Sequence, residues 1–335
     1  MKFLVESKVP FVRGLLEPYG SVDYAAPDEI TPERLRDADG IIIRTRTKCN
    51  ADTLGDSRCR MIATATIGTD HIDLPWCASR GIEVANAPGC NAPAVAQYVL
   101  GSLAAVSPKP FAETTLGIVG VGHVGRIVER WARSLGMNVL LCDPPRQRAE
   151  GGEHWRTLGQ IAAEADAITF HTPLTTEGPD ATWHLADDTF FNALRRKPVI
   201  INSARGPVTD TQALLRAINA GVTGPVVIDC WENEPDISRE LLDAAAIATP
   251  HIAGYSLQGK WRASQMAVDA VAAHFGLPPV HLREPAPMPV LDAITEAQAR
   301  AYNPLATDTP ALKNHPEDFE LLRNTYSLRP EPGQL

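Results

Sequence analysis

The chain has 335 residues, enough for two or more domains that each bury a core of their own. Its hydrophobic content of 44% and charged content of 21% are those of an ordinary globular protein, and its net charge of −9 gives nucleic-acid binding no electrostatic support. The apolar runs are too short to span a membrane, and the first residues become charged too early for a signal peptide. We therefore expect a cytoplasmic protein with no nucleic-acid and no membrane partner.

The cysteines form no C-x-x-C pair, and several of them lie in apolar runs. This pattern predicts reduced residues that serve packing, with no disulfide framework and no metal site. The six positions are Cys49, Cys59, Cys77, Cys90, Cys142 and Cys230.

Short apolar runs recur about every twenty residues in the N-terminal part of the chain, with polar, helix-compatible stretches between them. This alternation predicts a doubly wound parallel sheet with crossover helices, here a flavodoxin-like domain over residues 1–91. A helix over Ala92–Ala105 then leads to the next domain. The expected strands are Lys2–Val5, Ser21–Ala25, Gly40–Arg44, Met61–Thr66 and Ile82–Ala85.

Residues 115–143 are the segment around which the second half of the chain is organised. A strand over Leu116–Val121 meets three glycines with G-x-G-x-x-G spacing, and an amphipathic helix follows. The first glycine permits a tight turn, the second lets the backbone approach a pyrophosphate, and the third lets helix and strand pack closely. The helix directs free N–H groups at the phosphates. We expect a dinucleotide to bind at Gly120, Gly122, His123, Val124 and Gly125.

Asp143 ends the second strand of this segment, 18 residues beyond Gly125. A carboxylate there can accept hydrogen bonds from the adenosine ribose, and its charge repels a 2′-phosphate, which favours NAD. Arg146 weakens that preference, because an arginine just beyond the acid can favour NADP.

Six strand-like runs separated by plausible helices follow residue 115, as a complete Rossmann domain requires. We assign residues 92–254 to this domain. A helix capped by Ser256 and running to Ala273 is expected to return to the first domain, over 255–276. Residues 277–335 are rich in proline and predict a short C-terminal appendage. The six runs are Leu116–Val121, Asn138–Cys142, Ala167–Phe170, Val199–Asn202, Val226–Asp229 and Ala246–Ala248.

Three charged or titratable residues lie just past the ends of the last three runs: Arg205, Glu234 and His251. In such sheets ligands bind beyond the carboxyl ends of the strands. A histidine can take the hydroxyl proton while a nicotinamide takes the hydride, a carboxylate can orient it, and an arginine offers a fork to a substrate carboxylate. Glu232 competes with Glu234 for the supporting position. The pattern predicts an oxidoreductase.

Several motifs resemble the D-isomer-specific 2-hydroxyacid dehydrogenases: GIVGVGHVG, HTPL at 171–174, INSARG at 201–206, IDCWENEP at 228–235 and TPHIAGY at 249–255. The resemblance implies that Arg205 orients the substrate, Glu234 supports the base and His251 is the acid/base. It also places cofactor contacts, beyond the glycine segment and Asp143, at Thr172, Ser203, Ala204, Arg205, Asp229 and Gly254.

Further motifs resemble one subgroup of that family, which acts on a phosphorylated four-carbon 2-hydroxy acid in pyridoxal phosphate biosynthesis: TATIGTDHID, APGCNAPAVAQYV, LLCDPPR and HIAGYSLQGK. The resemblance implies NAD-dependent oxidation at C2, with substrate contacts from Thr45, Thr66 and Tyr255. Arg44 follows a strand in the first domain and is a candidate for the substrate phosphate.

Other interpretations remain open. The substrate could be another 2-hydroxy acid of the glycerate or 3-phosphoglycerate type, or the chain could be a non-catalytic NAD(H)-binding corepressor. The resemblance implies a homodimer. The C-terminal tail is, however, shorter than the dimerisation domain that members of this subgroup carry.

Overall fold

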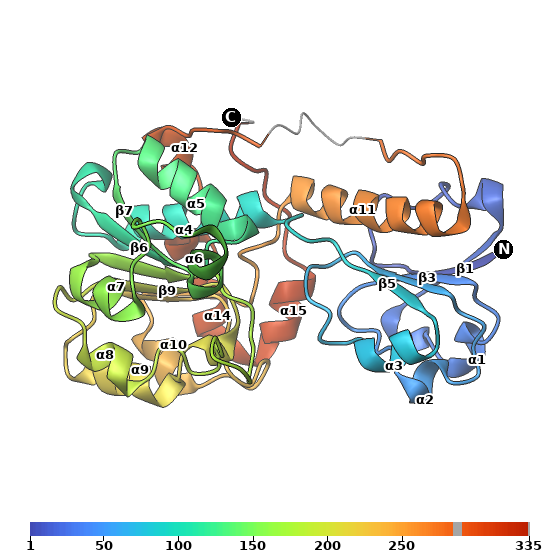
Figure 1. Ribbon diagram of the computed structural model, residues 1–335, viewed down its shortest axis with the longest axis horizontal. Helices are drawn as coiled ribbons and strands as arrows, with labels where there is room; N and C mark the ends of the chain where they lie inside the picture. The colour runs from blue at the N-terminus through green and yellow to red at the C-terminus, as the bar shows by residue number, and fades with distance from the viewer. Residues whose placement is uncertain (284–289, 334–335) are drawn as a thin grey trace. The chain divides into compact units, whose positions relative to one another are not determined.

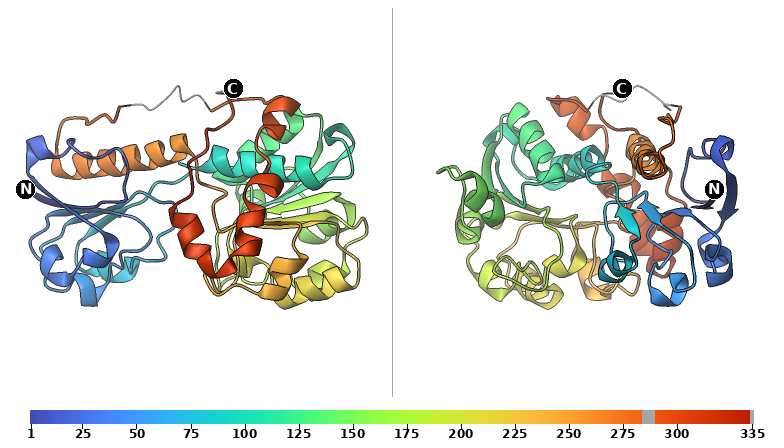
Figure 2. Two further views of the ribbon diagram at one scale, coloured as in Figure 1. Left: turned by 180° about the vertical axis from the view of Figure 1, so that it is seen from behind. Right: turned by 45° about the vertical axis from the view of Figure 1, so that its right-hand side comes forward.

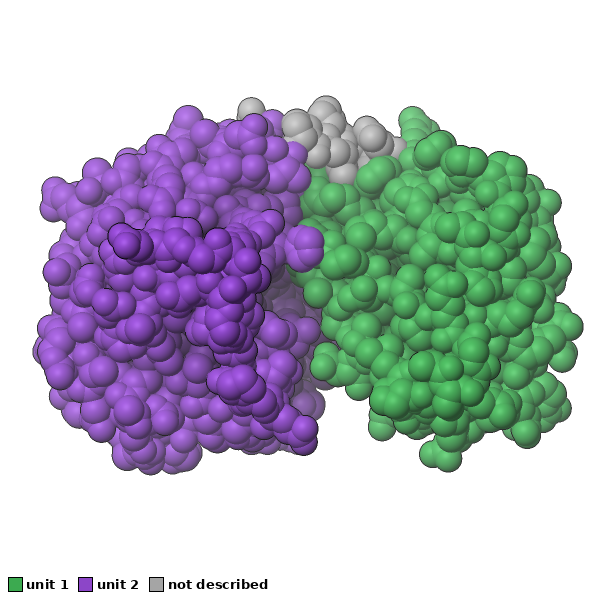
Figure 3. Space-filling model, in the orientation of Figure 1, with its two compact units in different colours: residues 1–91, 256–288 green, residues 92–255, 289–335 purple. Residues whose placement is uncertain are grey.

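The computed structural model describes residues 1–283 and 290–333. They form two compact units, made of the described residues among 1–91 and 256–288 and among 92–255 and 289–335 (Figure 3). The sequence places 277–335 in a separate appendage, whereas the described residues from 290 onward group with the second unit. No helix in the described part of the chain is long and apolar enough to cross a membrane.

The first unit is built on a sheet of five parallel strands in the order β2-β1-β3-β4-β5. This is the flavodoxin-like order that we expected, and four of the strands begin at the predicted residue. The strands are β1 (Lys2–Glu6), β2 (Ser21–Ala25), β3 (Gly40–Ile43), β4 (Met61–Thr64) and β5 (Glu83–Ala85).

Both faces of this sheet are covered, as its continuous apolar runs require. Helix α11 (Leu257–Phe275), capped by the Ser256 side chain, packs with Phe3, Val5 and Ile42 on one face. Leu4 and Ile41 point to the other face, where the short helices pack. Figure 1 shows α11 on one side of the strands and the short helices on the other. These helices are α1 (Pro32–Leu35), α2 (Ala51–Leu54) and α3 (Leu74–Ser79), with 3-10 turns at Glu17–Tyr19 and Pro27–Glu29.

The second unit contains six parallel strands in the order β11-β10-β9-β8-β6-β7. An isolated parallel bridge from Leu141 to Trp155 extends the β7 edge. Trp155 therefore occupies the place of a third strand, and the order of the sheet becomes 3-2-1-4-5-6-7, which is the Rossmann order 3-2-1-4-5-6 with β11 added at the far edge. The sequence pattern did not reveal the position of Trp155. The strands are β6 (Thr115–Val119), β7 (Asn138–Cys142), β8 (Ala167–Phe170), β9 (Val199–Asn202), β10 (Val226–Ile228) and β11 (Ile247–Ala248).

Two cores lie on opposite faces of this sheet, and successive strand residues alternate between them, as with Ile200 and Ile201. Helices α4 (Ala92–Val106) and α5 (His123–Ser134) cover one face, and helices α7 (Leu158–Glu164), α8 (Asp188–Asn192), α9 (Thr211–Asn219) and α10 (Arg239–Ala244) cover the other (Figure 1). This part of the chain also contains α6 (Pro144–Glu150) and 3-10 turns at Phe111–Glu113 and Gly206–Val208.

The C-terminal segment, residues 290–333, packs on the β11 edge of this sheet and on α4, as the rear view in Figure 2 shows. Thr309 bonds to the Ala248 amide, and Leu312 and Phe319 are fully buried in the same core as Trp231. The segment contains α12 (Glu296–Arg300), α13 (Pro304–Thr307), α14 (Thr309–Asn314), a 3-10 turn at Pro316–Asp318 and α15 (Phe319–Asn324).

Candidate active site

The glycine turn joins β6 to α5 at the point where the strand order reverses, which is where nucleotides bind in such sheets. Gly120 has φ +88°, and a Cβ there would meet the His171 backbone at 2.7 Å. A Cβ on Gly125 would come within 2.2 Å of the Gly120 carbonyl oxygen, whereas one on Gly122 would meet no atom within 4 Å. The first and third glycines are needed by the fold, and the second leaves open space for a phosphate.

Asp143 is tied to this turn. Its carboxylate accepts hydrogen bonds from the amides of Val121 (2.8 Å) and Arg146 (3.0 Å), so it caps α6 and holds the glycine loop. The Arg146 guanidinium is paired with Glu150 at 2.8 Å and donates to the Val121 carbonyl oxygen at 2.6 Å. Because these contacts hold Arg146, it is a weaker candidate for a 2′-phosphate than the sequence suggested.

Two further cofactor candidates carry hydroxyls without a partner in the described structure. The Oγ1 of Thr172, after β8, and the Oγ of Ser203, after β9, are both inaccessible to water and unbonded. A buried polar atom without a partner costs free energy, which a ligand that bonds to it would relieve. Together with the space at Gly122, these groups fit a dinucleotide along the carboxyl ends of the strands.

His251 and Glu234 lie side by side. The Nδ1 of His251 is 2.8 Å from Oε2 of Glu234 and 3.1 Å from Oε1, and the Trp231 amide donates to Oε1 at 2.9 Å. Burial raises the pKa of Glu234, but the hydrogen bond and charge of His251 outweigh burial and leave this pKa below its usual value. An ionised Glu234 only accepts, so Nδ1 is the donor to it, and in the neutral form of the imidazole Nε2 keeps its lone pair.

Asp229 shapes the loop that presents His251. Its buried carboxylate accepts bonds from the Thr249 hydroxyl (2.7 Å) and from the amides of Ile252 (2.7 Å) and Ala253 (2.9 Å). The residue at 251 adopts a left-handed conformation, with φ +56°. These hydrogen bonds show that Asp229 organises residues 249–253, next to the predicted contact Gly254, and its own role as a cofactor contact stays a prediction.

Cys230 links the ends of β9 and β10 with the His251 loop. Its Sγ is 3.5 Å from the Ala204 carbonyl oxygen. The same Sγ lies within 4.8 Å of a carboxylate oxygen of Glu234 and a ring nitrogen of His251. The charge of Arg205 also acts on this thiol. Burial, the main cause, raises the pKa of Cys230 well above its usual value, so the thiol stays protonated and is a poor metal ligand.

Arg205 is presented by a turn that Asn202 builds. The Asn202 side chain donates to the Arg205 carbonyl oxygen at 3.0 Å and accepts from the Ala204 amide at 3.1 Å. Arg205 itself is half-buried, and its Nη1 donates to the Ala204 carbonyl oxygen at 2.8 Å. The predicted Arg205, Glu234 and His251 therefore converge on one edge of one sheet.

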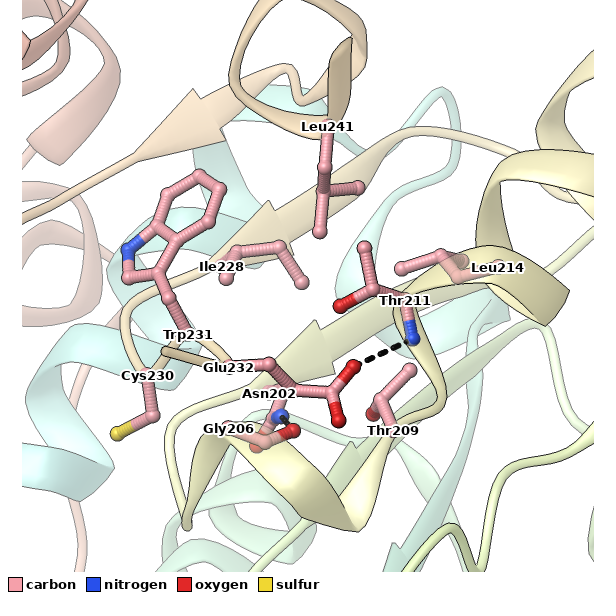
Figure 4. A pocket seen from close by; sticks show the side chains of 10 residues that line it. All are labelled: Asn202, Gly206, Thr209, Thr211, Leu214, Ile228, Cys230, Trp231, Glu232 and Leu241. Atoms are coloured by element: carbon pink, nitrogen blue, oxygen red, sulfur yellow. Dashed lines mark hydrogen bonds between the residues drawn. The ribbon is translucent and has the colours of Figure 1, made fainter. Parts of the chain in front are cut away.

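Glu232, the alternative to Glu234, is engaged elsewhere. Its carboxylate accepts from Nε2 of His184 at 2.8 Å and from the Thr211 amide at 2.9 Å. Figure 4 shows it in a small cavity, directed at Thr211, while the Cys230 sulfur points away from it. Glu232 is thus bound to the start of α9, and Glu234 alone of the two contacts His251 in the described structure.

The substrate candidates of the first unit follow two neighbouring strands. Arg44 and Thr45 come after β3, and Thr66 comes after β4. The Arg44 amide donates to Glu6 at 2.9 Å, while its Nε is inaccessible to water and has no partner. The Thr66 hydroxyl contacts Thr64 at 2.6 Å and the Gly68 carbonyl oxygen at 3.1 Å, and Thr45 is exposed.

Arg329, which sequence reasoning missed, is buried and bonds to the loop after His251. It donates to the carbonyl oxygens of Ile252 (3.1 Å) and Tyr255 (3.0 Å) and to that of Ala253, and its guanidinium lies 4.3 Å from the Tyr302 ring centroid. Its Nε bonds to Gln97, 232 positions earlier in the chain. No local pattern in the proline-rich tail could have indicated these partners.

Comparison with known proteins agrees with this geometry. Residues 97–253 match the family model of the D-isomer specific 2-hydroxyacid dehydrogenase, NAD binding domain. The chain belongs to the D-isomer-specific 2-hydroxyacid dehydrogenase family and is an NAD-binding oxidoreductase, as the resemblance implied.

The chain matches its relatives over nearly the whole length of both sequences. It is 48% identical to the erythronate-4-phosphate dehydrogenase of Bacteroides thetaiotaomicron, over 99% of this chain and 97% of the relative. It is 44% identical to the protein of that name from Bacteroides fragilis, over 99% and 98%. Among solved structures, the TT0316 protein of Thermus thermophilus superposes with a TM-score of 0.70 at 25% identity, over 83% of this chain and 98% of that one.

Proposed function

We propose that this protein oxidises 4-phospho-D-erythronate at C2 to 2-oxo-3-hydroxy-4-phosphobutanoate, with NAD⁺ as acceptor, as a step of pyridoxal 5′-phosphate biosynthesis. The observation that carries this proposal is the 2.8 Å contact between His251 and Glu234 at the carboxyl edge of the NAD-binding sheet. The substrate is suggested by the relatives at 44–48% identity, which are erythronate-4-phosphate dehydrogenases.

His251, Glu234 and Arg205 each have a separate role in the proposed reaction. NAD⁺, when bound, accepts the hydride from C2. His251 takes the hydroxyl proton on Nε2, because Glu234 holds the proton on Nδ1. The carboxylate also stabilises the imidazolium that forms, and the planar fork of Arg205 suits the substrate carboxylate.

The remaining substrate contacts belong to the same proposal. Arg44 binds the phosphate, and Thr45, Thr66 and Tyr255 contact the rest of the substrate. The unpartnered, buried Nε of Arg44 supports its role, because an anionic ligand would supply the missing acceptor. Arg44→Ala should therefore reduce the preference for phosphorylated over unphosphorylated substrates.

The test is turnover by the purified protein on 4-phosphoerythronate, glycerate, 3-phosphoglycerate and other 2-hydroxy acids, with a 2-oxo acid present to reoxidise NADH. We expect 4-phosphoerythronate to give the highest kcat/KM. His251→Ala should abolish NADH formation while NADH binding stays within a few-fold of the wild type. A preference for glycerate or 3-phosphoglycerate would assign another dehydrogenase of the family, and binding of NADH without any turnover would support a corepressor.

The proposal includes a homodimer, which the resemblance implies. Exposed apolar side chains of the C-terminal segment, Leu305 at 38% and Leu321 at 56% exposure, are candidates for its contact surface. Sedimentation velocity of the wild type and of Leu321→Lys tests this, with a dimer expected only for the wild type.

A further inference from the structure

The C-terminal segment contributes a second arginine, Arg323, whose charge acts on Glu234, the partner of His251. It lies on α15, whose residues Phe319 and Leu322 pack in the core that contains Trp231. Trp231 in turn donates its amide to Glu234. Helix α15 is thus fixed against the segment that carries the supporting carboxylate.

Arg323 is mostly buried, and it interacts with Tyr255 and with Glu234. Its side chain is only 19% exposed, and its guanidinium hydrogen-bonds to the Tyr255 side chain. Its charge acts on Glu234 and on Cys230, and Glu320 on its own helix lies 3.7 Å from Nη1. The Nε of Arg323 is inaccessible to water and has no partner in the described structure.

We propose that Arg323 is a positioning residue of this active site: its guanidinium holds the Tyr255 hydroxyl and places a fixed positive charge beside Glu234, which governs how readily His251 releases its proton. This inference rests on the proposed role of His251 as acid/base. It assigns the C-terminal segment a part in the chemistry.

The charge balance around the pair gives the direction of the effect. A cation near Glu234 offsets part of the negative charge that stabilises the imidazolium form of His251, so removing Arg323 should make the imidazolium harder to deprotonate. Burial lowers the pKa of Arg323, but its neighbours outweigh burial and raise it, so the charge persists. The titratable and charged groups around the pair are Asp229, Cys230, Arg205, Tyr255, Arg323 and Glu320.

Variants at positions 323 and 255 separate the effect of the Arg323 charge from the effect of its hydrogen bond to Tyr255. Arg323→Met removes both, Arg323→Lys keeps the charge, and Tyr255→Phe removes only the hydroxyl. Arg300→Met is the matched control, because Arg300 belongs to the same segment, is 51% exposed and pairs with Glu296 on α12.

The first measurement needs no turnover. The imidazole resonances of His251 are followed against pH in the full-length protein and assigned with His251→Gln. We expect Arg323→Met to move the titration midpoint of His251 up by roughly 0.5–1 pH unit, the effect of one nearby charge in a half-buried site. Arg323→Lys, Tyr255→Phe and the control should stay within about 0.2 unit of the wild type.

The second measurement is the pH profile of kcat/KM for 2-hydroxy acid oxidation. Its acid limb should move to higher pH in Arg323→Met by the same amount, whereas Tyr255→Phe should raise KM and leave the limb in place. An unchanged midpoint and limb in folded Arg323→Met would overturn the inference. A wild type without turnover would defeat the proposed function, and the midpoint of His251 would still decide the role of Arg323.

Discussion

Gly206 and Trp231 approach each other so closely that a Cβ on Gly206 would lie 1.9 Å from the Trp231 carbonyl oxygen. Gly206 directly follows Arg205, and Trp231 donates its amide to Glu234. The close approach of these two backbones therefore sets the spacing between the arginine and the carboxylate of the proposed site.

Gly206→Ala should disrupt this arrangement. The atoms in the way are backbone atoms of Trp231 and Glu232, which cannot move without shifting the whole segment. We expect a loss of about 3 kcal/mol or more in the free energy of unfolding, measured by urea denaturation, together with loss of turnover. Gly159→Ala is the control, because a Cβ there meets no atom within 4 Å, and it should be neutral or slightly stabilising. Equal stability of the two variants would contradict this account.

Glu234→Gln separates the two acids of the IDCWENEP motif. The amide cannot stabilise the imidazolium as a carboxylate does, so kcat should fall on the order of 10²-fold or more. Glu232→Gln should change kcat by only a few-fold, because Glu232 bonds to His184 and Thr211 rather than to His251. Steady-state kinetics of both variants at neutral pH provide the comparison, and a larger loss in Glu232→Gln would reverse the assignment.

Arg329→Met should destabilise the second unit. The variant leaves the carbonyl oxygens of Ala94, Ile252, Ala253 and Tyr255 without their donor in a buried site. Each orphaned group costs roughly 1–3 kcal/mol, so the four together predict a loss of about 4 kcal/mol or more in the free energy of unfolding, measured by urea denaturation. Arg300→Met, whose side chain is 51% exposed, should cost less than about 1 kcal/mol.

His171 should make stability depend on pH. Burial lowers the pKa of His171 to about 3, whereas an unfolded histidine has a pKa of about 6.5. Between these values the unfolded chain binds one more proton, so the free energy of unfolding should fall by about 1.4 kcal/mol for each unit that pH decreases. It should be largest above about pH 6.5 and cease to change below about pH 3.

His171→Gln should remove this part of the slope, as urea denaturation between about pH 4 and 6 can measure. The exposed His281 is the matched control, and His281→Gln should keep the wild-type slope. If His171→Gln kept it as well, another group would be responsible.

Much of the fold follows from local pattern. Four of the eleven strands, Ser21–Ala25, Asn138–Cys142, Ala167–Phe170 and Val199–Asn202, have the predicted bounds, because short apolar runs between turn residues are typical of buried parallel strands. The strand predicted to reach Val121 ends at Val119, since Gly120 already turns with a positive φ. Trp155 was missed because a single bridged residue in a polar stretch carries no periodic signal.

The sequence by itself determined the two doubly wound sheets and the glycine turn, because each depends on patterns of residues near one another in the chain. It also placed Arg205 and His251 just past the ends of two of the strands. The tertiary structure pairs His251 with Glu234 rather than with Glu232, as the resemblance implied, and it alone brought Arg323 and Arg329 to the loop after His251. The partners of Arg329 at Ala94 and Gln97 lie 235 and 232 positions away. Such contacts form when the whole unit closes around its core, and no local propensity encodes them.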